Sequence, residues 1–417
     1  MSFPQSFSSW GRNSLVWIWT IFVLSIFLPI QIPIVEKMSF WSGIRMPFQT
    51  VDWEISFFPL GILLLLLGGA LLFKKTSARP WSISWLGILA VLFLFISFYV
   101  HPQSFSGNYL LLRLLLLGGL FYFIREDAVL LDRAGKVCIF AAVVESVLAC
   151  VQVLPHIFSQ QHFGNGAFVL TSSYGEILRA SGSFAHPNIL GFFLVFAFFL
   201  LEPLTARWKN LRYVLIVGIL LTFSRSAFLA LLLGIFLQGI FSQENSRPFR
   251  EKYGSPFVIL SLLGLVFRQY FDTISPSNGE RISQLGVAWE SIKSAPFFGI
   301  GAGNFPVAMA KLAPFAPWEL QPVHNLFLLF GSEFGLIVGL SFGYLFVKLW
   351  KNMQKIQDLT HRKMLLGLWA TLCIFAFFEH LLFTSLVGVF CCCFAMTFFF
   401  TDADEDLSLF NANPLVK

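Results

Sequence analysis

Long apolar runs separated by short polar segments dominate this sequence. A helix needs about 20 apolar residues to cross a bilayer, and most of the runs have roughly this length. Two runs, 211–241 and 364–400, are too long for one helix, so we interpret each as a hairpin of two short helices. The pattern predicts an all-α integral membrane protein with about twelve transmembrane helices. The single-span runs are 15–34, 57–73, 81–100, 108–124, 137–155, 187–204, 255–270 and 323–347.

The placement of charge then orients the chain, because Lys and Arg are enriched in cytoplasmic loops. With a cytoplasmic N-terminus and a hairpin at 211–241, most of the 28 Lys and Arg face the cytoplasm. A single helix at 211–241 would move the basic residues of 247–252 to the outside. We therefore expect both termini to be cytoplasmic. The second hairpin would turn near Glu379–His380, and the longest external segments are 156–186 and 271–322.

Composition supports the membrane interpretation. Hydrophobic residues make up 57% of the chain and charged residues 12%, with a mean hydropathy of +0.76, which excludes an ordinary soluble protein. The net charge of +6 is spread between apolar runs, whereas a nucleic-acid partner would need a concentrated basic patch. The six Cys lie in apolar runs without a Cys-x-x-Cys pattern. We expect residues 1–417 to form one polytopic domain in a lipid bilayer, without a short cleavable signal peptide and without a nucleic-acid partner.

The second external segment is expected to be partly helical. Ser277 to Glu280 fits a capping box with Ser277 as N-cap, and a helix over 278–294 would lie on the membrane face. Arg281 lies in its first turn, off the apolar stripe of the helix. That stripe comprises Ile282, Leu285, Trp289 and Ile292.

Two further features follow in the same segment. The sequence Gly-Ile-Gly-Ala-Gly of 299–303 either admits a phosphate group or is a plain turn. His324 stands at the outer mouth of an apolar helix that includes Glu333. Since histidine exchanges a proton near neutral pH, His324 is a candidate base, with a purely interfacial role as the alternative.

Other charged residues lie near the outer face or within the predicted spans. Arg225 sits at the turn of the 211–241 hairpin, where it either faces an anionic partner or reaches the surface. Arg179 opens the segment of 179–188, in which His186 is either a titrating group or part of a helix start. Arg113 and Glu145 lie inside predicted spans, where they could pair for structure or serve function.

Motifs that the sequence lacks also exclude some kinds of reaction. No external segment has an Asp-x-Asp sequence or a cluster with metal-ligand spacing, and no cytoplasmic segment has a phosphate-binding loop. We therefore expect no cofactor and no tightly held metal. Arg179, Arg225 and Arg281 would bind an anionic group, because guanidinium forks bind phosphate oxygens in pairs. With His324 as base, these residues suit metal-free transfer from a lipid-linked diphosphate.

In these motifs the chain resembles the O-antigen ligase and O-antigen polymerase superfamily of bacterial envelope glycosyltransferases. The resemblance covers roughly 175–340 and rests on the order of short motifs. One departure is Ser226, where the family often has Gly. The motifs are Arg-Ala-Ser-Gly-Ser-Phe-Ala-His-Pro-Asn at 179–188, Thr-Phe-Ser-Arg-Ser at 222–226, Arg281 with Trp289, Ala-Pro-Phe-Phe-Gly-Ile-Gly-Ala-Gly-Asn-Phe at 295–305, and His-Asn-Leu-Phe-Leu at 324–328 with Glu333 and Gly335.

The resemblance implies a membrane glycosyltransferase that moves a glycan from undecaprenyl diphosphate to an acceptor hydroxyl, without metal or nucleotide. It places the reaction on the periplasmic side of the bacterial inner membrane. Arg225 and Arg281 match diphosphate-binding residues, and His324 matches the proposed acceptor-activating base. Arg179 matches a recurrent arginine of less defined role.

The acceptor remains open at this point. Lipid A-core would make the protein a ligase of lipopolysaccharide biosynthesis, another lipid-linked glycan would make it a polymerase, and protein-glycosylating relatives use a Ser or Thr hydroxyl. His186 and Glu333 are candidate supporting residues. A transporter or flippase of lipid-linked oligosaccharide is the alternative from another functional class, and it would need charged sites at the membrane midplane.

Overall fold

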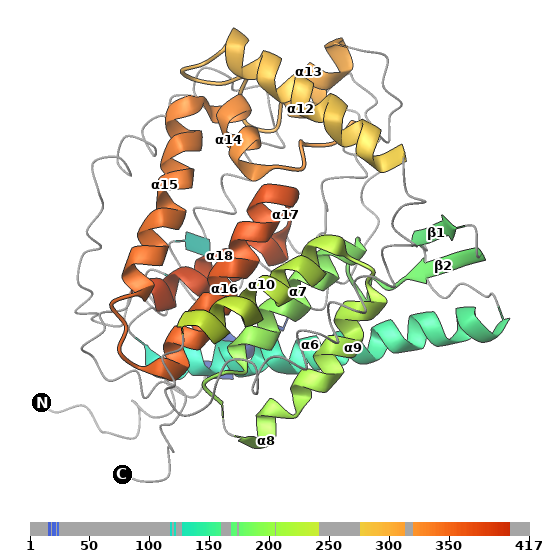
Figure 1. Ribbon diagram of the computed structural model, residues 1–417, viewed down its shortest axis with the longest axis vertical. Coiled ribbons are helices and arrows are strands. Elements are labelled where there is room, and N and C mark those ends of the chain that lie inside the picture. Colours follow the sequence, from blue (N-terminus) through green and yellow to red (C-terminus); the bar gives the residue numbers. More distant parts are fainter. Residues whose placement is uncertain are drawn as a thin grey trace, which may run out of the picture.

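The computed structural model describes residues 127–159, 168–172, 175–204, 206–241, 276–312 and 320–400, with isolated positions within 16–24 and 117–121. Helices make up nearly all of this part (Figure 1), which confirms the predicted all-α class. The earlier helices are α6 (Ala128–Ser159), α7 (Pro187–Leu200), α8 (Ala206–Lys209), α9 (Leu211–Leu221) and α10 (Arg225–Phe241). The later helices are α12 (Pro276–Ser294), α13 (Phe305–Leu312), α14 (Leu326–Phe334), α15 (Leu336–Met353), α16 (Leu359–Phe378), α17 (Leu381–Thr384) and α18 (Leu386–Phe399).

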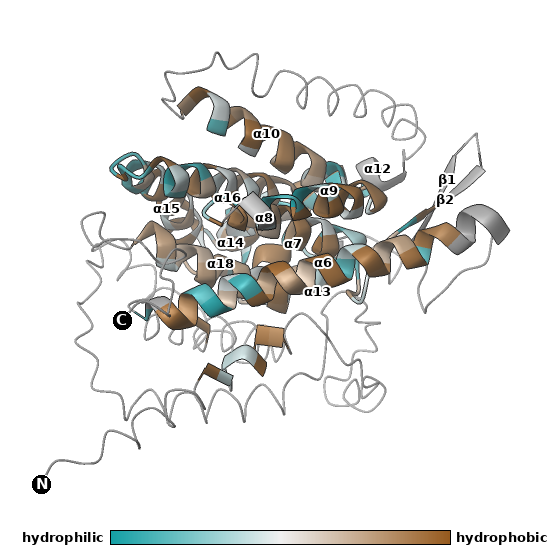
Figure 2. Ribbon diagram, turned by 90° about the horizontal axis from the view of Figure 1, so that it is seen from below, coloured by the Kyte–Doolittle hydropathy of each residue, from teal (hydrophilic) through white to brown (hydrophobic). Residues whose placement is uncertain are grey.

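Two of the described helices are long and apolar enough to cross a membrane. They are the Val129–Leu154 part of α6 and the whole of α16, Leu359–Phe378. Figure 2 shows α6 as mostly hydrophobic, with polar turns toward the end that lies away from the two strands. The runs at 57–73, 81–100 and 255–270 lie outside the described residues. The count of about twelve spans and the sidedness of the termini therefore stay predictions.

Both long apolar runs are divided into shorter helices, the first into two and the second into three. In the first run, α9 ends at Leu221 and α10 begins at Arg225, so Thr222–Ser224 form the turn. Phe223 takes the positive φ of 47° that this tight turn requires. In the second run, α16 ends at Phe378, and Glu379 and His380 separate it from the short α17, which leads into α18.

Two helix predictions need correction. The run 323–347 is not one helix, because Gly335 breaks it into α14 and α15 with a φ of 91°. A Cβ there would lie 2.1 Å from the carbonyl oxygen of Phe297, so only glycine fits. The helix predicted over 278–294 is confirmed as α12, but it begins at Pro276, and Ser277 is not its N-cap. Proline is favoured in a first turn because its φ already matches the helix.

The apolar stripe predicted on α12 is only partly right. Ile282 and Trp289 are 70% and 56% exposed, and Leu285 is also exposed, so these side chains share an outward face. Ile292 is buried instead. Its Cδ1 atom lies close to Gly331 of α14, and the missing side chain of that glycine leaves room for Ile292 to pack inward.

A two-stranded hairpin, which the sequence pattern did not predict, lies within the segment of 156–186 that was predicted to be external. Strand β1 (Phe168–Ser172) pairs antiparallel with β2 (Gly175–Arg179), with Phe168 opposite Arg179. The backbone N–H of Ala180 then donates to the carbonyl of Leu221, 2.9 Å away. The end of β2 is thereby tied to the turn between α9 and α10.

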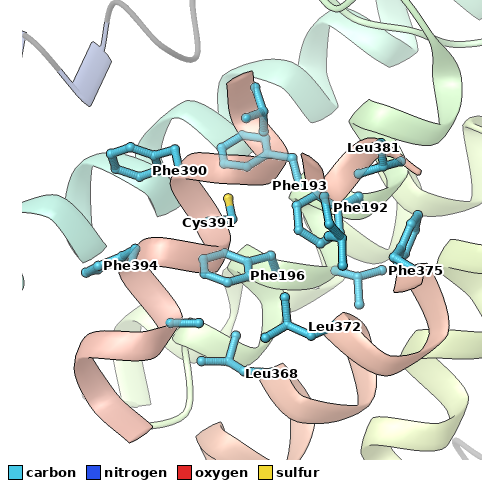
Figure 3. Close-up of a cluster of buried hydrophobic side chains, with 14 of the residues drawn as sticks. Phe192, Phe193, Phe196, Leu368, Leu372, Phe375, Leu381, Phe390, Cys391 and Phe394 are labelled. Atoms are coloured by element: carbon cyan, nitrogen blue, oxygen red, sulfur yellow. The ribbon is translucent and has the colours of Figure 1, made fainter. Parts of the chain in front are cut away.

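The apolar core forms around α7. This helix is apolar on all sides and is buried along almost its whole length, as expected for a helix without a polar face. Its phenylalanines pack against α16, α17 and α18 (Figure 3). The labelled residues are Phe192, Phe193, Phe196, Leu368, Leu372, Phe375, Leu381, Phe390, Cys391 and Phe394. Dense packing of this kind holds the helix ends in fixed relative positions.

Two glycines admit the ring of Phe199 between α10 and α16, and this contact gives a stability test. A Cβ at Gly234 would lie 2.2 Å from Phe199 Cζ, and one at Gly367 would lie 2.0 Å from Phe199 Cδ1. We expect Gly234→Ala and Gly367→Ala each to lower the free energy of unfolding by about 1–3 kcal/mol through overpacking. Thermal unfolding in detergent, followed by circular dichroism, measures this change.

The matched control for these variants is Gly286→Ala on α12, where an added Cβ meets nothing within 4 Å. Alanine favours helix over glycine by up to about 1 kcal/mol, so this variant should be neutral or stabilising. Equal melting temperatures for Gly367→Ala and Gly286→Ala would contradict the tight packing around Phe199.

Candidate functional site

Segments far apart in the sequence converge on the carboxylate of Glu379, which follows the C-terminal end of α16. One carboxylate oxygen, Oε1, accepts a hydrogen bond from Asn188 Nδ2 at 2.8 Å. The same oxygen lies 3.3 Å from Arg281 Nη2 and accepts a longer hydrogen bond, 3.4 Å, from Ser226 Oγ. The other oxygen, Oε2, lies 3.1 Å from His324 Nδ1. One buried carboxylate thus contacts the helix starts of α7 and α10, the first turns of α12, and the segment before α14.

The surroundings of Glu379 keep it charged. Burial alone would raise the pKa of this carboxyl, since only 3% of the residue is exposed. The hydrogen bond from His324 and the positive charge of Arg281 act in the opposite direction and prevail, so the pKa is lowered. A buried carboxylate needs such partners, because an unpaired one would be costly.

The charge of Glu379 fixes the proton arrangement on His324. A carboxylate only accepts hydrogen bonds, so His324 Nδ1 must carry the hydrogen of their contact. In the neutral ring, Nε2 then holds the lone pair and is the nitrogen able to take a proton. The side chain of His324 is 19% exposed, so the ring is not sealed from an approaching substrate.

Asn325 fixes the position of the backbone beside His324. It is the N-cap of α14, and its Oδ1 accepts from the backbone N–H of Leu328 at 2.9 Å. Its Nδ2 donates to the carbonyl oxygen of Phe377 at 3.0 Å. The start of α14 is therefore bound to the end of α16, where Glu379 lies.

Arg179, at the end of β2, contacts the turn between α9 and α10. Its Nε donates to the carbonyl of Thr222 at 3.0 Å, and its Nη2 donates to Asn188 Oδ1 at 2.7 Å. Burial lowers the pKa of Arg179 to about 10, a value at which the guanidinium is still protonated near neutral pH. Because Asn188 in turn bonds Glu379, Arg179 supports the centre of the site through one intervening side chain.

Arg225 and Arg281 supply positive charge around the same carboxylate. Arg225 is the first residue of α10 and is exposed, whereas Arg281 is partly buried and also donates from Nη1 to the carbonyl of Phe378 at 3.3 Å. Their charges act on the guanidinium of Arg179, so the arginines are near neighbours. Three guanidinium groups around one carboxylate give an excess of positive charge, which suits an anionic ligand.

His186 has the helix-start role that the sequence left open. It is the N-cap of α7, and its Nδ1 accepts from the backbone N–H of Asn188 at 3.0 Å. Burial, and then the charge of Arg179, lower the pKa of His186 to about 4. The ring is therefore neutral near pH 7, and its capping bond requires the neutral form.

His380 is a neighbour that the sequence did not single out. Its ring centroid lies 5.0 Å from that of His324, and its Nδ1 is 2.7 Å from Thr384 Oγ1. Burial lowers the pKa of His380 to about 3. A neutral His380 adds no positive charge beside His324, the candidate base.

Glu333 contacts the backbone that follows the glycine segment of 299–303. Its Oε1 accepts from the backbone N–H of Phe305 at 3.2 Å. The backbone N–H groups of Ile300 and Gly301 donate to the carbonyls of Ser332 and Glu333, at 2.8 and 3.0 Å. These two N–H groups are used within the protein, which favours the plain-turn interpretation of this segment over the phosphate-binding one.

The α6 helix anchors the motif that carries Arg179 and His186. Glu145 Oε2 accepts from the backbone N–H of Ser183 at 2.9 Å, and its Oε1 accepts from the hydroxyl of Ser183 at 2.5 Å. Gln152 Oε1 accepts from the backbone N–H of Gly182 at 2.9 Å, and its Nε2 donates to the Gly182 carbonyl at 2.7 Å. The structure thus gives Glu145 a structural role, whereas Arg113 lies outside the described residues.

Glu379, Asn188 and Asn325 are the site residues that the sequence reasoning did not identify as such. Asn188 and Asn325 stand beside motif histidines, and this adjacency was the available signal. Glu379 carried only the signal of an acidic residue inside a long apolar run. Within the described ranges, no group of three or more His, Cys, Asp and Glu side chains is placed to hold a metal ion.

Comparison with known protein families adds a match in the same region. Residues 213–343 match the family model described as O-antigen ligase. This segment includes Arg225, Arg281 and His324, and the match confirms the resemblance to the O-antigen ligase and polymerase superfamily. The match covers less than a third of the chain, and over these residues the chain is similar to the O-antigen ligase family. A search of curated proteins finds no match to the chain.

Removing the central carboxylate should cost stability. We expect Glu379→Ala to lower the free energy of unfolding by about 3–5 kcal/mol, because it leaves the partly buried Asn188 and the neighbouring cations without their acceptor. Glu379→Gln keeps the side-chain shape and should cost less. Thermal unfolding of both variants measures the difference in their stability. Wild-type melting temperatures for both variants would contradict the central place of this carboxylate.

Proposed function

We propose that this protein transfers a glycan from undecaprenyl diphosphate to a sugar hydroxyl, as an O-antigen ligase or polymerase. The observation that carries the proposal is the position of Glu379 between His324 Nδ1, at 3.1 Å, and Arg281 Nη2, at 3.3 Å. A base and a diphosphate-binding cation are thereby held on one carboxylate. The match over residues 213–343 supports the same class of reaction.

In the proposed reaction, the acceptor hydroxyl gives its proton to Nε2 of His324. Its oxygen forms a bond to the anomeric carbon of the donor glycan. The bond from that carbon to the diphosphate oxygen breaks, and its electron pair leaves with undecaprenyl diphosphate. Arg225 and Arg281 stabilise the negative charge that develops on this leaving group, and Arg179 positions the loop beside them.

No step in this scheme requires a metal ion or a nucleotide. The guanidinium groups supply the positive charge that a divalent cation would supply to a departing diphosphate. We further propose that the site faces the periplasm in a multi-pass protein of the inner membrane. Lipid A-core and a second lipid-linked glycan are the acceptors to be compared.

One of the two residues that favoured a transporter, Glu145, has a different role. The transporter alternative relied on Glu145 and Arg113 as charged groups near the membrane midplane. Glu145 is fully buried and accepts hydrogen bonds from the backbone N–H and the hydroxyl of Ser183, so its carboxyl group holds the segment that carries Arg179 and His186.

The central test is His324→Ala in proteoliposomes supplied with a polyprenyl-diphosphate glycan. Transfer should fall by roughly 10²–10⁴-fold, because the general base is lost. A control is His361→Ala at the other end of α16, and it should keep near-wild-type transfer per folded molecule. A chelator should leave wild-type transfer unchanged. Wild-type rates in the His324 variant would remove this residue from the mechanism.

A further inference from the structure

Helix α12 presents its large apolar side chains outward. Ile282, Leu285 and Trp289 are 70%, 44% and 56% exposed, and their spacing places them on one face. The inward face is buried and carries Val287, Ala288 and Ile292 together with the polar Gln284 and Ser291. Adjacent large apolar side chains that are this exposed are suited to an apolar partner.

The outward stripe begins beside the candidate site. Arg281, which bonds Glu379, immediately precedes Ile282. From Ile282 to Trp289 the stripe runs about 10 Å along the helix axis, at 1.5 Å per residue. One end of the stripe thus coincides with the cluster of guanidinium groups, while the rest extends away from it.

Beyond α12, exposed apolar residues continue to a second helix. Phe297 and Phe298 follow the end of α12 and are both exposed. The backbone N–H of Leu336, the first residue of α15, donates to the carbonyl of Pro296 at 2.9 Å, so the start of α15 lies against this segment. Leu336 and Leu340 are exposed on α15. An apolar surface therefore leads from Arg281 toward the outer face of α15.

We propose that this apolar track, formed by Ile282, Leu285, Trp289, Phe297 and Phe298, binds the polyprenyl chain of the donor. The proposal rests on the proposed function, because it assumes a lipid-linked diphosphate at Arg281. Such a donor joins an anionic head to a long apolar chain. The protein offers the matching order of surfaces, with cations at one end and exposed apolar side chains next to them.

The position of the apolar track next to Arg281 distinguishes a bound polyprenyl chain from general contact with the bilayer. Contact with lipid would not require the stripe to start at the residue that follows a site arginine. A polyprenyl chain does require this, because its first isoprene unit is bonded directly to the diphosphate. The track supplies ground-state binding remote from the reacting carbon, so it should act on the KM of the donor and leave kcat nearly unchanged.

The test uses two donors that share the glycan and the diphosphate. One carries the undecaprenyl chain and the other a short, water-soluble prenyl chain. The test variant is Leu285→Ser/Trp289→Ser, and the matched control is Phe140→Ser, which changes an exposed apolar residue on α6, a helix that lies far from α12 in Figure 1. Initial rates are measured in detergent solution, so that bilayer contact does not enter.

For the undecaprenyl donor, the double variant should raise KM by about tenfold or more and leave kcat within about twofold. For the short-chain donor it should match wild type, and Phe140→Ser should match wild type with both donors. An equal loss with both donors would overturn the track, as would an unchanged KM for the undecaprenyl donor. If wild-type protein transferred the glycan from neither donor, the proposed function itself would fail, a result distinct from failure of the track alone.

Discussion

A buried carboxylate at the end of α16 is the constraint on which the rest of the site depends. Glu379 is almost fully enclosed, so its charge is tolerated only while Asn188, Arg281 and His324 remain within hydrogen-bonding distance. Each of these partners belongs to a different segment. Displacement of any one of them would leave a buried charge with too few partners. The electrostatic requirement of one residue thereby fixes the relative positions of the loops that carry the candidate base and the arginines.

The apolar core makes this arrangement rigid. Helix α7 is buried on all sides, and Phe199 fills the space that Gly234 and Gly367 leave between α10 and α16. The ends of α7, α10 and α16 are the positions at which site residues emerge. Glu145 on α6 accepts a hydrogen bond from the backbone N–H of Ser183 and so fixes the motif that begins at Arg179. Apolar packing and a few buried hydrogen bonds together give the polar site its geometry.

The sequence predicted the helical class and the division of the 211–241 run into two helices, because the length of a hydrophobic run indicates how many helices it can hold. It could not reveal Glu379 as the centre, since the partners of this residue lie 55 to 191 positions away. It also could not orient α12. Helical spacing defines a stripe, but in a membrane protein the outward face is also allowed to be apolar. Ile292 was therefore grouped with residues that point the other way.

The most direct measurement of the central claim is the kcat of Glu379→Gln for glycan transfer from polyprenyl diphosphate. The amide oxygen can still accept from Asn188 and Arg281, but the amide nitrogen would face His324 Nδ1 as a donor. The favoured ring tautomer would then carry its hydrogen on Nε2 and lack the lone pair that takes the acceptor proton. We predict a fall in kcat of roughly 10²-fold or more in protein that remains folded. A wild-type kcat would contradict the account.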